Sequence, residues 1–174
     1  ECALCGYPPE DLVLKPHFLD AMKTELGTLV SDFPEGLTGV VGTVTQGTKK
    51  PRNTAAVFAN GKLLGSYNKR QLPNYGVFDE QRIFEPGEGP VGILLKGHRI
   101  GIQICEDSWV HEAEDLATYS KVNLSVLLNL SASPFHQTKF PERLAILQST
   151  AESVNAPLAY CNLVGGQDEL VFDG

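Results

Sequence analysis

The residues best suited to chemistry lie where an alternating apolar segment ends in a thiol. The segment Ile100-Gly-Ile-Gln-Ile-Cys-Glu-Asp-Ser-Trp109 has isoleucine at every second position, then a cysteine followed by two carboxylates. This pattern predicts a strand with Cys105 at its carboxyl end, the edge at which sheets of α/β proteins usually present reactive groups. Adjacent negative charge raises the pKa of a thiol, so a nucleophilic Cys105 needs an opposing cation. The alternative is that Cys105 is a small buried apolar residue.

Two further chargeable residues, Lys69 and Glu1, are expected at strand ends. Lys69 follows two short apolar segments joined by Asn60-Gly61, a dipeptide that favours the positive φ angles of a β-hairpin turn. Glu1 precedes Leu4 and the pair Gly6-Tyr7. A carboxylate, an ammonium and a thiol are therefore each expected where a strand ends.

The segments that must position these residues alternate between strand and helix patterns. Residues 124–130 are almost continuously apolar, which is typical of a strand buried on both faces, and residues 71–90 predict a long ordered loop. Apolar spacing predicts helices over residues 17–30, 111–120 and 141–155, and strands over 40–45, 54–59, 62–67, 91–95, 99–105 and 157–162. Hairpins mixed with strand–helix–strand units indicate an α/β fold with mixed sheets.

We expect a single domain over residues 1–174. Because the chain begins without methionine and ends as another strand begins, we expect it to be a piece of a longer protein.

Composition excludes several classes of function. The 174 residues are 42% apolar and 20% charged, which is ordinary globular composition, and no apolar run reaches the roughly 20 residues that span a bilayer. Without a signal-peptide pattern, a soluble cytoplasmic protein with no membrane partner is expected. The net charge of −7 argues against nucleic acid as a partner, since only Lys49-Lys50-Pro51-Arg52 is clustered and basic.

The other cysteines and the histidines give weaker signals. Cys2 and Cys5 have the spacing of a redox pair or half a zinc site, but no second such pair follows, so we interpret them as small core residues and predict no metal. The four cysteines do not form a dense disulfide pattern, and we expect thiols. A catalytic pair of Cys105 with a histidine remains an alternative, and His136 is the candidate histidine, because it belongs to one of the motifs given below.

Five ordered motifs resemble those of the nitrilase, or carbon–nitrogen hydrolase, superfamily, and are most similar to the glutamine amidotransferase domain of glutamine-dependent NAD⁺ synthetases. Together they span the chain and are far more specific than any one alone. The motifs are Glu1-Cys-Ala-Leu-Cys-Gly-Tyr-Pro-Pro-Glu-Asp-Leu12, Tyr67-Asn-Lys-Arg-Gln-Leu-Pro-Asn-Tyr-Gly-Val-Phe-Asp-Glu80, Ile102-Gln-Ile-Cys-Glu-Asp107, Asn129-Leu-Ser-Ala-Ser-Pro-Phe-His136 and Gly165-Gly-Gln-Asp-Glu-Leu-Val-Phe-Asp-Gly174.

The resemblance implies catalytic roles, because the superfamily uses Glu, Lys and Cys in this order. Cys105 would attack the amide, Lys69 with the backbone N–H of Glu106 would stabilise the oxyanion, and Glu1 would act as general base. Lys69 would also offset the acidic neighbours of Cys105. The implied fold is a nitrilase-like α-β-β-α sandwich with mixed sheets, incomplete at both ends.

Five further residues are implied to bind substrate, and four of them have a structural alternative. Glu80 matches the second glutamate of the superfamily, which holds the lysine or places the substrate, but it is otherwise an exposed loop acid. Tyr75 would line the glutamine pocket or be a core aromatic. Ser131 and Ser133 would bind the α-amino or α-carboxylate group, or be turn residues. Glu106 would shape the same pocket.

The implied activity is hydrolysis of glutamine to glutamate and ammonia through a thioester, with no cofactor. The ammonia would pass to an ATP-dependent synthetase domain that converts deamido-NAD to NAD. ATP and deamido-NAD would bind that domain, and no nucleotide loop of its type occurs in this sequence. A homo-oligomer is expected. The alternatives are an amidase acting on another small amide and a catalytically silent domain.

Overall fold

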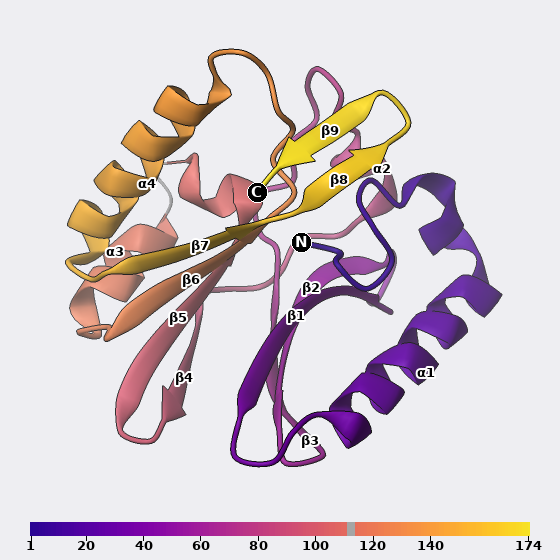
Figure 1. The fold of residues 1–174 in the computed structure, drawn as a ribbon, viewed down its shortest axis with the longest axis horizontal. Helices are drawn as coiled ribbons and strands as arrows, with labels where there is room; N and C mark the ends of the chain where they lie inside the picture. Colours follow the sequence, from indigo (N-terminus) through magenta and orange to yellow (C-terminus); the bar gives the residue numbers. More distant parts are fainter. Residues whose placement is uncertain (111–113) are drawn as a thin grey trace. The chain divides into compact units, whose positions relative to one another are not determined.

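The computed structural model describes residues 1–110 and 114–174, which form two compact units, Glu1–Glu88 and Gly89–Gly174 (Figure 1). Each unit has a sheet and helices of its own. Part of the helix predicted over residues 111–120 falls on 111–113, which lie outside the described residues; the described helix is α3 (Glu114–Lys121).

The first unit is built on an antiparallel sheet of order β1-β2-β3. Asn60 and Gly61 have φ angles of 49° and 72°, so the hairpin predicted at this dipeptide is confirmed. The predicted loop over 71–90 contains one short helix. The elements of the unit are a 3₁₀ turn η1 (Glu10–Leu14), α1 (Pro16–Asp32), β1 (Thr38–Thr45), β2 (Arg52–Ala59), β3 (Lys62–Asn68) and α2 (Glu80–Ile83).

Helix α1 lies along the sheet of this unit and supplies one side of its core (Figure 1). Pro16 occupies the first turn, where a missing N–H leaves no hydrogen bond unmade, so the helix begins at the proline. Leu26 and Val30 pack against Ala56 and Phe58 of β2. This packing fixes the sheet whose third strand ends immediately before Lys69.

The second unit contains a mixed sheet of order β4-β5-β6-β7, antiparallel between the first two strands and parallel between the others. The predicted mixed α/β class is confirmed. Because β5 and β6 are parallel, their carboxyl ends share one edge of the sheet. The elements of the unit are β4 (Val91–Leu95), β5 (His98–Ile104), a 3₁₀ turn η2 (Cys105–Ser108), α3, β6 (Val126–Ser131), α4 (Lys139–Val154), β7 (Leu158–Asn162), β8 (Val164–Gln167) and β9 (Leu170–Asp173).

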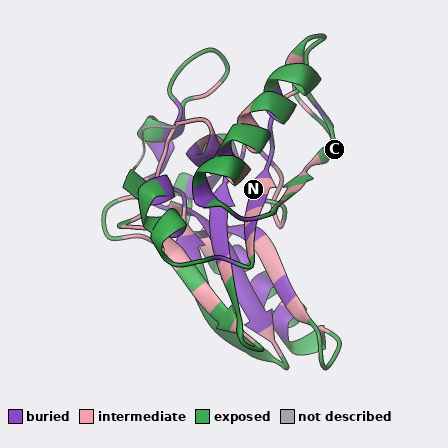
Figure 2. Cartoon of the chain, turned by 90° about the vertical axis from the view of Figure 1, so that its left-hand side faces the viewer, coloured by how far each residue is buried: buried purple, intermediate pink, exposed green. Residues whose placement is uncertain are grey.

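Strand β6 differs from the expectation of burial on both faces. Leu127, Asn129 and Ser131 are buried, whereas the alternate residues of the strand are half-buried. Figure 2 shows buried residues concentrated on the strands and exposed residues along the helices. The fully buried face of β6 therefore carries two polar side chains toward the sheet edge that ends in Cys105. Within the described residues, no helix combines the length and apolarity needed to cross a membrane.

Candidate active site

In the first unit, Lys69 forms a buried cluster with two carboxylates. Its Nζ lies 2.6 Å from Oε1 of Glu1 and 2.7 Å from Oε1 of Glu80. The side chains of Lys69, Glu1 and Glu80 are 1%, 0% and 3% exposed, respectively. Buried ions of this kind persist only when they are paired and hydrogen-bonded, and here one ammonium serves two acids.

The two carboxylates do not have equivalent surroundings. Burial raises the pKa of Glu80 to about 7, and the negative charge of Glu1 adds to this effect while Lys69 opposes it. Near neutral pH, Glu80 therefore exchanges a proton while it remains bonded to Lys69. One ammonium between one carboxylate and one neutral acid is electrically balanced, which reduces the cost of burying the cluster.

Tyr7 and Asn53 complete the cluster. The hydroxyl of Tyr7 donates to Oε1 of Glu80 at 2.8 Å, and Nδ2 of Asn53 donates to Oε1 of Glu1 at 2.8 Å. We did not single out either residue in the sequence, where Asn53 lies between Arg52 and Thr54, before the apolar run of β2. Lys69 and a neutral donor therefore both contact each carboxylate.

Backbone contacts explain how Glu1 and Glu80 reach the lysine. The turn that follows Glu1 packs on β1 at Gly42, where a Cβ atom would lie 2.6 Å from the amide nitrogen of Cys2, so only glycine permits the approach. The amide of Leu4 donates to the Gly42 carbonyl at 3.0 Å. Glu80 begins α2, and its amide donates to the carbonyl of Pro73 at 3.1 Å. The backbone of the loop over residues 71–90 therefore positions Glu80 beside Lys69.

Tyr75 lies in the same loop and is 57% exposed. Its ring contacts Phe78 edge-on, with ring centroids 5.5 Å apart. The alternative of a buried core aromatic is wrong, because more than half of the residue is exposed. A role in substrate binding stays a prediction.

Cys105 lies in the second unit and is buried at the start of η2. Its φ angle is 45°, in the left-handed region that a residue with a Cβ atom rarely adopts. Such strain persists only where surrounding structure enforces it, and it is concentrated at functional sites. The strand predicted to deliver Cys105 is confirmed as β5, which ends at Ile104.

A buried polar network enforces the turn that contains Cys105. Nδ2 of Asn129 donates to Oγ of Ser108 at 2.7 Å and to the carbonyl of Cys105 at 3.4 Å. Oγ of Ser108 in turn donates to Oε1 of Gln103 at 2.8 Å. Oδ2 of Asp107 accepts from the amide of Ile104 at 2.8 Å. We predicted no separate role for any of these four side chains, although amide side chains within apolar strands are a signal that the sequence contains.

The predicted serines both lie near this sheet edge. Oγ of Ser131 donates to Oδ1 of Asn129 at 2.6 Å, so its proton is committed to the network. Ser133 is held through its backbone: its amide donates to Oδ1 of Asn162 at 2.8 Å, and its carbonyl accepts from Nη2 of Arg143 at 3.3 Å. Its hydroxyl is therefore carried on a fixed segment.

Lys139 is a cation near Cys105 that we did not predict. Burial lowers the pKa of Lys139, while the negative charges of Cys105 and Glu106 oppose that shift. Its Nζ lies 3.8 Å from the centroid of the Trp109 ring. Burial also raises the pKa of Tyr160 to about 12, and the charge of Cys105 contributes in the same direction. The described second unit thus supplies Cys105 with a positive neighbour of its own.

Other candidate chemistry has less support. Across residues 1–110 and 114–174, no three His, Cys, Asp or Glu side chains are grouped as a metal site would require. His136 is exposed and lies against Thr138 and Glu142, with Nε2 3.9 Å from Oε2 of the glutamate.

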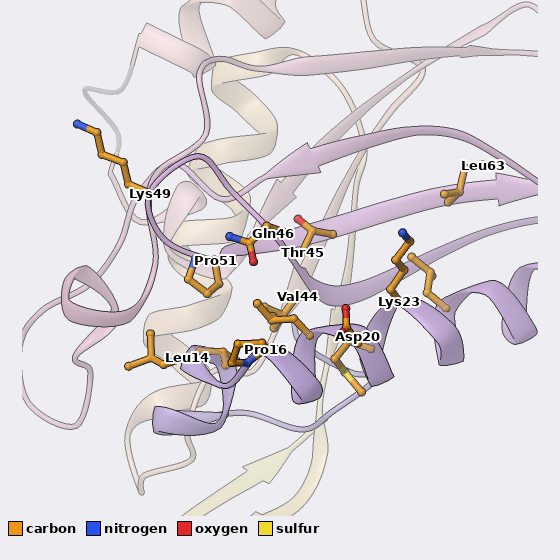
Figure 3. A pocket seen from close by; sticks show the side chains of 14 residues that line it. Leu14, Pro16, Asp20, Lys23, Val44, Thr45, Gln46, Lys49, Pro51 and Leu63 are labelled. Carbon is orange, nitrogen blue, oxygen red and sulfur yellow. The ribbon is translucent and has the colours of Figure 1, made fainter.

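A cavity of about 640 Å³ lies between α1 and the end of β1 in the first unit (Figure 3). The side chains of Pro16, Asp20 and Lys23 line one side, and those of Val44 and Thr45 line the other. No predicted site residue lines this cavity, so we do not assign the active site to it.

The fold is that of a class of amide-hydrolysing enzymes. The chain belongs to the carbon-nitrogen hydrolase family, whose family model matches residues 1–174. It is 40% identical over 174 residues to the glutamine-dependent NAD(+) synthetase of Aquifex aeolicus, covering all of this chain and 30% of that protein. The chain therefore spans about a third of the length of such relatives.

Solved structures agree on the fold. Glutamine-dependent NAD⁺ synthetase from Acinetobacter baumannii, in complex with ADP, matches with a TM-score of 0.91 and 37% identity, over 100% of this chain and 32% of that one. A mutant amidase from Nesterenkonia sp. AN1 matches with a TM-score of 0.77 and 28% identity, over 97% of this chain and 63% of that one. The predicted nitrilase-like fold is confirmed.

Proposed function

We propose that this chain hydrolyses the side-chain amide of glutamine to glutamate and ammonia. The observation that carries the proposal is the buried Lys69 held by Glu1 and Glu80. A buried ammonium fixed between acids is a preorganised cation for a developing oxyanion, and a strained buried thiol is a suitable nucleophile. The similarity to glutamine-dependent NAD⁺ synthetases supports glutamine as the amide.

The proposed reaction has two halves. Cys105 loses its proton to Glu1 and its sulfur attacks the amide carbon, while Lys69 and the backbone N–H of Glu106 stabilise the oxyanion. The carbon–nitrogen bond then breaks, ammonia leaves with the proton from Glu1, and a γ-glutamyl thioester remains. Water, deprotonated by Glu1, hydrolyses the thioester to glutamate and restores the thiol. The Nesterenkonia amidase supports this assignment, because the acetamide moiety of fluoroacetamide is added covalently at its active-site cysteine.

Substrate recognition is proposed for Tyr75, Glu80, Glu106, Ser131 and Ser133. To these we add Lys139, because a cation beside the nucleophile suits the α-carboxylate of glutamine. Glu106 supplies a negative charge near Lys139, which is the sign that the α-amino group requires.

The partners are proposals at the level of the whole protein. The hydrolysis itself needs no cofactor, and the ammonia is proposed to serve an ATP-dependent synthetase domain that converts deamido-NAD to NAD. The complex of the Acinetobacter synthetase with ADP supports nucleotide chemistry in that relative. A cytoplasmic homo-oligomer that binds neither nucleic acid nor membrane completes the proposal.

Ammonia release from glutamine, asparagine and propionamide tests the substrate. We expect a clear preference for glutamine, which Cys105→Ala abolishes. Lys139→Met should raise KM for glutamine about tenfold with little change for propionamide, which has no carboxylate. Gln148→Met, at an exposed position of the same helix, is the matched control.

The second candidate is an amidase specific for another small amide, favoured by the structural match to the Nesterenkonia amidase. Faster hydrolysis of propionamide than of glutamine would select this candidate and reject the first. Absence of hydrolysis of all three amides would support a catalytically silent domain.

A further inference from the structure

The turn after Glu1 carries two cysteines that the proposed function does not use. The amide of Cys5 donates to the carbonyl of Cys2 at 3.0 Å, and the amide of Gly6 donates to the same carbonyl at 2.8 Å. A hydrogen bond between residues three apart closes a β-turn, in which the two end Cα atoms lie within about 7 Å. Disulfides typically join Cα atoms about 4.4–6.8 Å apart, so the backbone already brings this pair within reach of a disulfide.

The two thiols have unequal surroundings. Cys2 is 0% exposed, whereas Cys5 is half-buried. A hydrogen bond between the thiols lowers the pKa of Cys5 and raises the pKa of Cys2. Thiol–disulfide exchange needs an accessible thiolate that attacks and a second thiol that resolves, and Cys5 and Cys2 meet these two requirements.

The same turn is closely coupled to Glu1. Cys2 follows Glu1 directly and has a φ angle of 41°, a left-handed conformation for a residue with a Cβ atom. A Cβ on Gly42 would meet the Cys2 amide nitrogen at 2.6 Å, so this backbone is packed against β1 without free space. A change at Cys2 therefore cannot be absorbed on the β1 side and is transmitted to the neighbouring residues of the turn.

We propose that Cys2 and Cys5 form a reversible disulfide with low-molecular-weight disulfides as oxidant, and that closure displaces Glu1 from Lys69. The Cys5 thiolate attacks one sulfur of oxidised glutathione, forms a mixed disulfide and releases one glutathione thiolate. Cys2 then loses its proton and attacks Sγ of Cys5, which expels the second glutathione. The protein gives up two electrons and two protons, and one glutathione disulfide is reduced to two thiols.

Closure brings the sulfur atoms to about 2.05 Å, much closer than a hydrogen bond between thiols. Because Cys2 is buried and its backbone is packed on Gly42, the turn must change its dihedral angles beside Glu1. Glu1 accepts hydrogen bonds from Nζ of Lys69 at 2.6 Å and from Nδ2 of Asn53 at 2.8 Å, and both contribute to its position. A displacement near 1 Å lowers catalysis by up to about a hundredfold, so we expect at least a tenfold loss of kcat. The expected loss of kcat rests on the proposed glutaminase function, whereas formation of the disulfide is independent of that function.

The test equilibrates the protein with mixtures of oxidised and reduced glutathione, followed by peptide mass spectrometry and glutamine hydrolysis. We expect the Cys2–Cys5 peptide to lose two hydrogens as the mixture becomes oxidising, kcat to fall at least tenfold in parallel, and dithiothreitol to reverse both changes. Cys5→Ser should lose both responses while the reduced enzyme keeps its activity, and Cys5→Ala provides a second removal of the thiol. Cys161→Ser, at an exposed cysteine in β7, should retain both responses.

Two results would overturn the proposal. One is glutathione retained on Cys5 without ring closure, and the other is closure that leaves kcat unchanged. A protein that closes the disulfide but hydrolyses no glutamine in either redox state would support the thiol site and contradict the proposed function instead.

Discussion

A single buried ammonium between two carboxylates makes each of the three side chains depend on the others. Lys69 is 1% exposed and both of its acidic partners are buried. If the lysine is lost, two carboxylates remain together in a dry environment, and breaking a buried ion pair on one side costs about 3–5 kcal/mol. The residues proposed to do chemistry are therefore also a large local contribution to stability.

Replacement of Lys69 tests this dependence. We expect Lys69→Ala to lower the free energy of unfolding by about 3–5 kcal/mol and to abolish glutamine hydrolysis. Lys62→Ala, at the exposed start of the strand that ends just before Lys69, should change the unfolding free energy by less than about 0.5 kcal/mol. Urea denaturation of both variants is the measurement, and equal stability of the two would contradict the role of the cluster.

Glu80 should make the protein less stable as the pH rises through neutrality. Its pKa is raised from 4.5 to about 7, so the folded state binds this proton more tightly than the unfolded state does. The stabilisation is full below pH 4.5 and is lost as the pH passes 7, a loss of up to about 3 kcal/mol. Glu80→Gln cannot ionise and should remove this decline.

Urea midpoints at pH 5, 6, 7 and 8 measure the effect. Glu88→Gln is the control, because the Glu88 side chain is 91% exposed. A decline of equal size in the wild type and in Glu80→Gln would assign the pH dependence to other groups.

At the scale of elements, the central feature is how one turn holds a strained cysteine. The turn η2 follows β5 directly, and Cys105 enters it with a φ angle of 45°. Asn129 of β6 reaches across the parallel strand pair to the carbonyl of Cys105 and to Ser108. The mixed sheet thus fixes the conformation of the cysteine through a neighbouring strand.

Asn129→Ala should release this turn. The substitution removes the acceptor of the Ser131 hydroxyl and a donor to the Cys105 carbonyl. We expect it to lower the free energy of unfolding by about 2–4 kcal/mol. We also expect the alkylation rate of Cys105 by iodoacetamide to change at least threefold. Gln148→Ala, exposed on α4, is the control. A variant as stable and as reactive as this control would show that Asn129 does not hold the turn.

The elements that sequence predicted well are those that local chemistry determines. Asn60-Gly61 can adopt the two positive φ angles of its turn, and the alternating isoleucines of β5 have a period that only a strand satisfies. Helix α2 and strand β8 were missed, because a four-residue helix has little periodicity and a glycine-rich strand has little apolar pattern, whereas the strand expected at the end of the chain is β9. The partial exposure of the other face of β6 was not predicted, since it depends on tertiary packing.

The candidate site divides in the same way. Lys69 and Cys105 were found because each follows a recognisable strand and matches a motif. Asn53 and Lys139 were missed, because neither stands in a motif and each takes its place from contacts distant in sequence. Sequence therefore indicated the groups proposed to react better than it indicated the side chains around them.

At the scale of the whole molecule, the chain spans about a third of the synthetases that it resembles, and its proposed product is ammonia. Ammonia carries the amide nitrogen of glutamine, which makes the transfer traceable. We expect that the protein, mixed with a separate ammonia-dependent NAD synthetase, ATP, deamido-NAD and glutamine labelled with ¹⁵N in its side-chain amide, will yield NAD labelled in its amide. Cys105→Ala should give no label from glutamine, while ¹⁵N-ammonium should label NAD equally with either protein. Label from ammonium but none from glutamine with the wild-type protein would contradict the proposed supply of ammonia.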